Sequence, residues 1–217
     1  MDAALRDDIG RRYRKDTLAG VFVTFEGPEG AGKSTALKAV AAALQERGHE
    51  VLCTREPGAG ELGRQIRELL LHGENLPTET ELLLFLADRA NHIATIVRPA
   101  LGSGKMVLCD RHADSTLAYQ GYGRGSDVAF LRSLNRYATR GLVPDLTVLF
   151  DLEPEIGLAR LTGKDRLDSE PMEFHRRVRA GFLRIAEEEP ERFRIVDASK
   201  DAEVVAVEVA ELVLARI

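Results

Sequence analysis

Five short, almost uninterrupted apolar runs alternate with longer stretches of helical periodicity, and this alternation constrains the fold more than any other feature. The runs fall at residues 21–25, 51–53, 106–109, 146–150 and 194–196. Strands that are apolar on both faces are typical of a parallel sheet covered by helices on both sides, with right-handed crossovers. The pattern therefore predicts an α/β fold built on a parallel sheet.

Local sequence patterns predict several helix boundaries. Thr78 with Glu81 forms a capping box ahead of the apolar run 82–86. In such a box the two side chains bond to the free N–H groups of the first helical turn. Ser126 is expected to open a further helix, which Gly141 closes.

Length and composition indicate an ordinary globular protein. With 217 residues, we expect one domain at residues 20–217, preceded by a mobile extension at residues 1–19 for which a helix is the alternative. A net charge of −5 argues against nucleic acid or anionic lipid as a partner. No apolar run could cross a bilayer and residues 1–17 lack the apolar core of a signal peptide, so we expect a cytoplasmic protein with no membrane partner. Cys53 and Cys109 show no metal-ligand spacing and are expected to be small buried residues.

A glycine-rich segment, Gly27-Pro28-Glu29-Gly30-Ala31-Gly32-Lys33-Ser34, directly follows the first apolar run and precedes a helical stretch at 33–47. It matches the pattern G-x-x-x-x-G-K-[ST], in which the backbone curls so that successive N–H groups face an anion at a helix N-terminus. Lys33 is expected to reach the β- and γ-phosphates of a nucleoside triphosphate, and Ser34 to coordinate Mg²⁺.

A second Mg²⁺ ligand is expected at the end of a neighbouring strand. Asp110 and Asp151 each follow an apolar run. We favour Asp110, with a structural ion pair or a cap as its alternative. Asp151 stands just before Glu153 and Pro154, and we expect it to cap the helix that begins there.

Arginines mark where a second anion would bind. Arg55 and Arg111 each follow a strand, so both should lie at the carboxyl edge of the sheet with the phosphate loop. Arg89 lies on a predicted helix, one turn after Phe85. A surface or structural ion pair is the alternative for each arginine alone, but their joint placement favours a basic acceptor pocket. An acceptor that already carries a phosphate is largely ionised at neutral pH and needs no general base.

Several further motifs accompany the phosphate loop. Phe25-Glu26-Gly27 leads into it, and later come Thr54-Arg55-Glu56-Pro57-Gly58, Asp110-Arg111-His112 with Ser115, Ala118-Tyr119-Gln120-Gly121-Tyr122-Gly123-Arg124-Gly125, Arg166-Leu167-Asp168 and Asp197-Ala198-Ser199. Through these motifs the chain resembles, over about residues 20–200, the bacterial type of the thymidylate kinase family. Members of this family are P-loop nucleoside-monophosphate kinases.

The resemblance implies transfer of the γ-phosphoryl group of ATP to dTMP in dTTP synthesis, giving dTDP and ADP, with Mg²⁺ as the cofactor. It also implies a three-layer P-loop kinase fold with a five-stranded parallel sheet, a short lid insertion and a homodimer. The ATP-binding positions that it implies are Gly27, Pro28, Glu29, Gly30, Ala31, Gly32, Lys33, Ser34, Thr35 and Arg160. The dTMP-binding positions are Glu29, Arg55, Phe85, Arg89, Arg111, Thr116, Tyr119 and Gln120.

The resemblance also implies individual roles. Arg111 together with Arg55 is expected to hold the acceptor phosphate. Phe85 is expected to stack on thymine and Arg89 to hydrogen-bond the base, while Thr116 and Gln120 line the base pocket. Tyr119 is expected to lie against the deoxyribose, where a 2′-hydroxyl on the sugar would crowd it. Ordinary core packing is the alternative for the two aromatic residues.

Residues 160–171 form a charged, glycine-containing stretch between two helical patterns, which is typical of a mobile lid. Gly30 stands where one branch of the family carries a catalytic arginine, so the resemblance implies the branch whose arginine lies in the lid. We expect Arg166, helped by Lys164, to supply this catalytic charge, and Arg160 to stack on adenine. A solvated charged loop is the alternative.

Two other functions stay open from the sequence. A kinase for another nucleoside monophosphate, such as dUMP, dCMP or AMP, would share every feature up to the base pocket. A nucleotide-switch ATPase would share only the phosphate loop.

Overall fold

The computed structural model describes residues 18–73, 76–163 and 165–216. Within these ranges five strands form one sheet in the order β2-β3-β1-β4-β5, and all neighbouring strands are parallel. The strands are β1 (Phe22–Glu26), β2 (Val51–Arg55), β3 (Met106–Asp110), β4 (Leu146–Asp151) and β5 (Phe193–Asp197). Each overlaps one of the predicted apolar runs, so the predicted α/β fold with a parallel sheet is confirmed.

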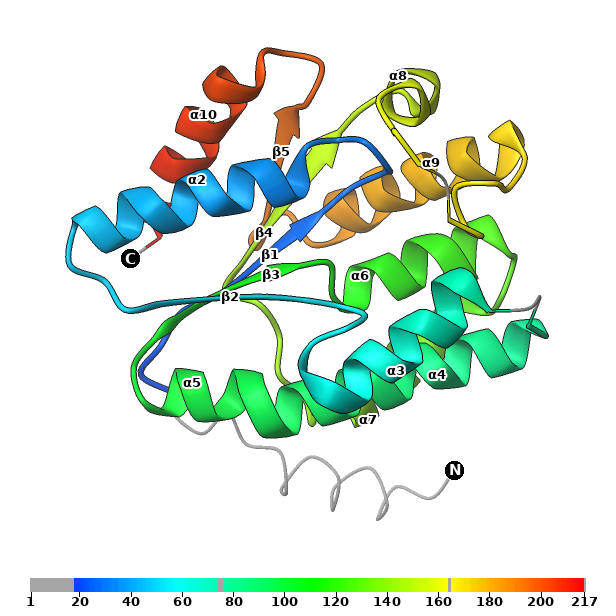
Figure 1. Ribbon diagram of the computed structural model, residues 1–217, viewed down its shortest axis with the longest axis horizontal. Helices are drawn as coiled ribbons and strands as arrows, with labels where there is room; N and C mark the ends of the chain where they lie inside the picture. The colour runs from blue at the N-terminus through cyan, green and yellow to red at the C-terminus, as the bar shows by residue number, and fades with distance from the viewer. Residues whose placement is uncertain (1–17, 74–75, 164, 217) are drawn as a thin grey trace.

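Helices cover both faces of this sheet. They are α2 (Lys33–Glu46), α3 (Gly60–His72), α4 (Thr78–His92), α5 (Arg98–Gly102), α6 (Ala113–Thr116), α7 (Val128–Ala138), α8 (Pro154–Ala159), α9 (Met172–Glu188) and α10 (Ala202–Leu214). The π-helical segments η1 (Ile93–Val97) and η2 (Leu117–Gly123) join α4 to α5 and extend α6. Helices α2 and α10 lie on one face, and α5 packs on the other, with α4 and α7 on that side too (Figure 1). The predicted three-layer arrangement is therefore confirmed.

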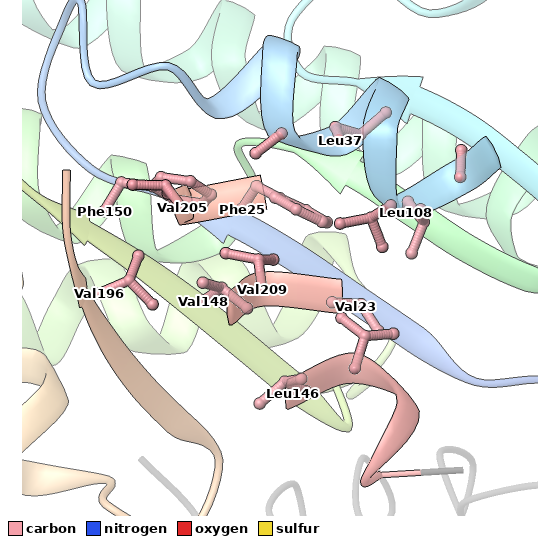
Figure 2. Close-up of a cluster of buried hydrophobic side chains, with 14 of the residues drawn as sticks. Val23, Phe25, Leu37, Leu108, Leu146, Val148, Phe150, Val196, Val205 and Val209 are labelled. Carbon is pink, nitrogen blue, oxygen red and sulfur yellow. The ribbon is translucent and has the colours of Figure 1, made fainter. Parts of the chain in front are cut away.

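The core follows from the two-residue period of the strands. Val23 and Phe25 of β1 point toward α2 and α10, where they meet Val205 and Val209 (Figure 2). The side chain of Phe22, also of β1, points to the opposite face of the sheet, where it packs with Ile93 and Val97 of η1. Both faces are thus apolar, which explains why the strands read as continuous apolar runs.

The two cysteines occupy different environments. Cys109 is buried, as predicted, on the interior strand β3. Cys53 is exposed, so its predicted burial is wrong. The reason is that β2 is an edge strand, and its side chains are only partly covered.

Two predicted helix starts are also wrong. Helix α4 begins at Thr78 itself, after Pro77, and no side chain caps it. Glu81 is buried and does not take part in a capping box. Helix α7 is capped by Asp127, not by Ser126, because the Asp127 carboxylate accepts a hydrogen bond of 3.0 Å from the backbone N–H of Phe130.

Two predictions concern residues that the structure does not describe, or describes only in part: the extension at residues 1–19 and the lid residue Lys164. Residues 1–17 and Lys164 lie outside the described residues. Within the described ranges, none of the helices combines the length and the apolar character that a membrane span requires.

Candidate active site

The phosphate loop connects the carboxyl end of β1 to the first turn of α2. Gly30 has φ 66°, and a Cβ atom there would lie 2.0 Å from the carbonyl oxygen of Gly157, so no side chain fits. The Lys33 ammonium donates hydrogen bonds to the carbonyl oxygens of Gly27 (3.0 Å) and Pro28 (2.7 Å). The cavity above the loop, here called the phosphate cavity, is bordered by the predicted ATP-binding residues Glu29, Gly30, Ala31, Gly32, Lys33, Ser34, Thr35 and Arg160.

Lys33 is a buried cation at the floor of this cavity, only 7% exposed. Burial, and then the positive charge of Arg111, lowers the pKa of the Lys33 ammonium to about 8, although Glu29 and Asp110 act in the opposite direction. The ammonium is therefore still protonated at neutral pH. A polyphosphate bound beside it would favour the charged form further.

Ser34 and Asp110 meet at the mouth of the phosphate cavity. The Ser34 hydroxyl donates a short hydrogen bond to the Asp110 carboxylate. A hydroxyl and a carboxylate oxygen are ligands that Mg²⁺ prefers, and Mg²⁺ commonly completes its shell with water and substrate phosphates. The described residues contain no cluster of three or more His, Cys, Asp or Glu that could hold a metal without such help. The pair therefore fits a Mg²⁺ that arrives with a nucleotide.

Asp151 has a different role from the predicted one. Its carboxylate accepts two hydrogen bonds from Arg179 of α9, at 2.7 and 2.9 Å. Glu153 occupies the N-cap position of α8, and Pro154 is its first residue. The predicted helix cap at Asp151 is thus wrong, because an arginine from another helix takes both carboxylate oxygens.

A second cavity lies beside the first, between the sheet, α3, α4 and η2. We call it the acceptor cavity, and its lining includes Glu29, Glu56, Arg67, Phe85, Arg89, Arg111, Thr116, Tyr119 and Gln120. The structure thus brings together seven of the eight predicted dTMP-binding residues. Arg55 borders the phosphate cavity instead and is exposed.

Arg111 stands at the junction of the two cavities in an unusual backbone conformation, with φ 67°. Left-handed backbone at a non-glycine residue costs about 1 kcal/mol or more, so the surrounding contacts must hold it. The Arg111 N–H donates to the Phe25 carbonyl oxygen (3.0 Å), and the next N–H, of His112, donates to the Glu26 carboxylate (2.8 Å). The turn after β3 is therefore pinned to β1.

The Arg111 guanidinium points across the junction. It donates to the carbonyl oxygen of Gly27 (3.0 Å), the hydroxyl of Ser115 (3.2 Å) and the carboxylate of Glu29 (2.6 Å). Tyr119 donates its hydroxyl to the other Glu29 oxygen (2.5 Å). Burial acts to raise the pKa of Glu29, but the charges of Arg111 and Lys33 outweigh it and hold that pKa at about 2. A carboxylate, two cations and a phenol thus form one polar cluster.

Arg89 is held rigidly in the wall of the acceptor cavity. Its guanidinium donates to Glu56 (2.8 Å), Thr116 (2.8 Å), Asn135 (2.7 Å) and the carbonyl oxygen of His112 (2.9 Å). A guanidinium has five N–H groups. Among the described residues these four bonds leave one N–H, on Nη2, for a ligand.

Glu56 and Asn135 were not identified from the sequence as site residues. Burial acts to raise the pKa of Glu56, but Arg89 and the histidines that bond to it hold that pKa well below its usual range. Asn135 shares the buried face of α7 with Leu131 and Ala138. A polar residue at helical spacing within an apolar face was the available signal for it.

Two arginines of the predicted lid, Arg160 and Arg166, lie in different places. The exposed Arg160 donates to the carbonyl oxygens of Ala198 (3.1 Å) and Gly30 (3.4 Å), next to the phosphate loop. Arg166 donates to the carbonyl oxygen of Leu70 (3.0 Å) and to the carboxylate of Glu81. In this conformation Arg166 does not contact the phosphate loop, and its catalytic role stays a prediction.

Comparison with known proteins identifies the family. The family model described as thymidylate kinase matches residues 25–209. The chain belongs to this family. The thymidylate kinase of Desulfovibrio desulfuricans is 54% identical over 87% of this chain and 92% of its own length, and that of Thermomicrobium roseum is 56% identical over 85% and 90%. The crystal structure of thymidylate kinase from Ehrlichia chaffeensis superposes with a TM-score of 0.75 at 36% identity, covering 89% of this chain and 98% of that one.

Family membership confirms the resemblance seen in the sequence, and with it the fold and the class of enzyme. Thymidylate kinases are nucleoside-monophosphate kinases and therefore transferases. The adjoining phosphate and acceptor cavities agree with an enzyme that binds two phosphate-bearing substrates together.

Proposed function

We propose that this chain transfers the γ-phosphoryl group of ATP to dTMP, giving dTDP and ADP, with ATP in the phosphate cavity and dTMP in the acceptor cavity. One observation supports this most: the two cavities share Glu29, Glu56, Arg67 and Arg111 as lining residues. Two ligands in these cavities would meet at a junction bordered by the guanidinium groups of Arg67 and Arg111. We place the reaction in the cytoplasm, as the sequence predicts.

The chemistry needs positioning and charge neutralisation rather than a general base. The second pKa of a phosphate monoester is about 6, so the acceptor oxygen is already ionised at neutral pH. Lys33 from the loop and Arg111 from the strand end would hold the two anions close despite their repulsion. Ser34 and Asp110 would hold Mg²⁺, which supplies further neutralisation of phosphate charge when bound.

The acceptor cavity also has the groups needed to bind a pyrimidine. Phe85 is half-buried in its wall and offers a flat face for stacking. The remaining N–H of Arg89 would donate to a carbonyl oxygen of the base. Tyr119, held by Glu29, would lie against the sugar.

The segment 160–171 would act as the lid. Arg160 is already beside the phosphate loop and would cover the adenine. Lys164 and Arg166 remain our proposed sources of the catalytic charge, and Arg166 would have to leave Glu81 to supply it.

An exposed apolar surface supports a homodimer. Large apolar side chains are exposed on three neighbouring helices: Leu62 and Leu69 of α3, Leu83 of α4, and Phe130 and Tyr137 of α7. Exposed apolar surfaces of this kind often mark protein interfaces. Light scattering at micromolar concentration should therefore give twice the chain mass, and a monomer would contradict the proposal.

The function is tested by following the phosphoryl group. With γ-labelled ATP and Mg²⁺, we expect the label to appear in dTDP. We also expect ADP formation to depend on dTMP. Initial rates with dUMP, dCMP and AMP should be lower than with dTMP. Equal ATP hydrolysis with and without dTMP, and no labelled diphosphate, would favour a nucleotide-switch ATPase instead.

A further inference from the structure

Glu81 is a buried carboxylate to which the proposed reaction gives no role. It lies in the first turn of α4 and is only 1% exposed. It accepts hydrogen bonds from Gln120 Nε2 (2.9 Å), from Arg124 Nε and Nη2 (2.8 and 3.0 Å) and from Arg166 Nη2. One carboxylate thus joins α4, η2 and the predicted lid.

The carboxylate is ionised at neutral pH. Burial acts to raise the pKa of Glu81, but hydrogen bonds from Arg124, Gln120 and Arg166 outweigh it, so that the pKa is lowered. An ionised carboxylate can only accept hydrogen bonds. It therefore prefers a neighbouring group that presents a hydrogen-bond donor.

This preference determines which way the Gln120 amide is turned. The amide nitrogen must face Glu81, because the carbonyl oxygen would meet another acceptor there. The Gln120 carbonyl oxygen is then directed away from Glu81, and no group within residues 18–73, 76–163 and 165–216 donates a hydrogen bond to it. Gln120 is 2% exposed and lines the acceptor cavity beside Arg89 and Thr116. The free acceptor is thus available to a ligand in that cavity.

A free acceptor on Gln120 and a free donor on Arg89 match one kind of pyrimidine edge. Thymine and uracil carry a donor at N3 and an acceptor at O4, whereas cytosine carries an acceptor at N3 and a donor at N4. If Gln120 turned over, its NH₂ group would suit cytosine N3. The orientation of one amide therefore affects which base is accepted.

We propose that Glu81 is a positioning residue for base selection, which holds the Gln120 carbonyl oxygen toward the acceptor cavity and thereby disfavours cytosine. This inference rests on the proposed phosphorylation of dTMP. Glu81 does not line the acceptor cavity, so its effect on the base would be exerted through Gln120. Arg124 donates two hydrogen bonds to the carboxylate and keeps it in place when Arg166 leaves.

The experiment compares kcat/KM for dTMP, dUMP and dCMP in the full-length wild type and in Glu81→Gln. The new amide can donate to the Gln120 carbonyl oxygen, so Gln120 can turn over. We expect the preference for dTMP over dCMP to fall by at least about tenfold. The preference for dTMP over dUMP should stay within about twofold, because both bases carry N3–H. A merely structural role would lower all three values in parallel, and that result would overturn the proposal.

Glu170→Gln is the matched control. Glu170 also binds Arg124, at 2.9 Å, but has no bond to Gln120. We expect this variant to keep the wild-type preference for dTMP over dCMP. A loss equal to that of Glu81→Gln would assign the effect to Arg124 and overturn the proposal.

Two further measurements keep the test decisive if Glu81→Gln does not fold. Glu81→Asp retains an acceptor-only group, and its preference should stay within about twofold of wild type. In the wild type, dTMP methylated at N3 should react at least about tenfold more slowly than dTMP. Lost preference in the aspartate variant, or an unchanged rate with the methylated substrate, would refute the role of the carbonyl oxygen. Wild-type enzyme that phosphorylates none of the three monophosphates would instead refute the proposed function.

Discussion

The Arg111→Ala substitution removes a charge that borders both cavities. At hydrogen-bonding distance, and with the effective dielectric constant of about 20 that suits protein sites, one unit charge interacts with another by about 4 kcal/mol. Arg111 is 17% exposed on its side chain, so solvent screens it only in part. At 1.36 kcal/mol per tenfold in rate, loss of this charge should lower kcat/KM for dTMP by about 10³-fold.

The same substitution leaves Glu29 without its closest cation. The lowering of the Glu29 pKa from 4.5 to about 2 corresponds to a net effect of about 3 kcal/mol favouring the ionised carboxylate, in which burial is outweighed by Arg111, Lys33 and Tyr119. Because this pKa is depressed, the wild type has the full benefit above pH 4.5 and loses it as the pH falls toward 2. In Arg111→Ala the loss of stability on acidification should be smaller. The variant should still fold at pH 7.

Activity and folding are measured separately. Coupled assays of ADP formation give kcat/KM, while circular dichroism and urea denaturation at several pH values give stability. Arg176→Ala is the matched control, since Arg176 is 58% exposed on α9 and pairs with the exposed Glu155. Its kcat/KM should equal that of the wild type. If Arg111→Ala retained kcat/KM within about fivefold of wild type, or failed to fold while the control folded, the assignment of Arg111 to ligand binding would be refuted.

Three further predictions concern groups around the phosphate loop. Lys33→Met should lower kcat by at least about 10²-fold and leave the circular dichroism spectrum unchanged, and unfolding would show that Lys33 is structural. Ser34→Ala should raise the Mg²⁺ concentration needed for half-maximal rate several-fold, and an unchanged Mg²⁺ dependence would exclude it as a ligand. Burial, and then the charge of Asp114, raises the pKa of Glu26 from 4.5 to about 7, so stability should decline by up to about 3 kcal/mol as the pH rises through this interval. Urea denaturation should show that Glu26→Gln removes this decline, and identical pH profiles would contradict it.

The sequence was sufficient for features that depend on neighbours along the chain. The phosphate loop is one, because the glycines, Lys33 and the flanking strand and helix are contiguous. The strands are another, since burial on both faces of β1, β3 and β4 leaves continuous apolar runs. Helix α3 (Gly60–His72) was not anticipated. Its glycines, at positions 60 and 63, obscured an otherwise amphipathic pattern.

Base-pocket residues were located through family motifs rather than through local pattern. Phe85 and Tyr119 could equally have been core residues by periodicity. Tyr119 and Gln120 lie on the π-helical segment η2, whose wider turn is not visible in the sequence. Their shared cavity arises only when η2 packs beside α4.

The sequence by itself determined the sheet, the phosphate loop and the family, because each is encoded in contiguous residues. Only the tertiary structure decided the partners of the buried charges. Glu81 looked like a helix cap but binds Gln120 and two arginines, and Asp151 looked like a cap but binds Arg179. An acid near a helix start has the same local sequence in either role. Which donors reach it depends on how distant segments pack, and burial makes those donors decisive.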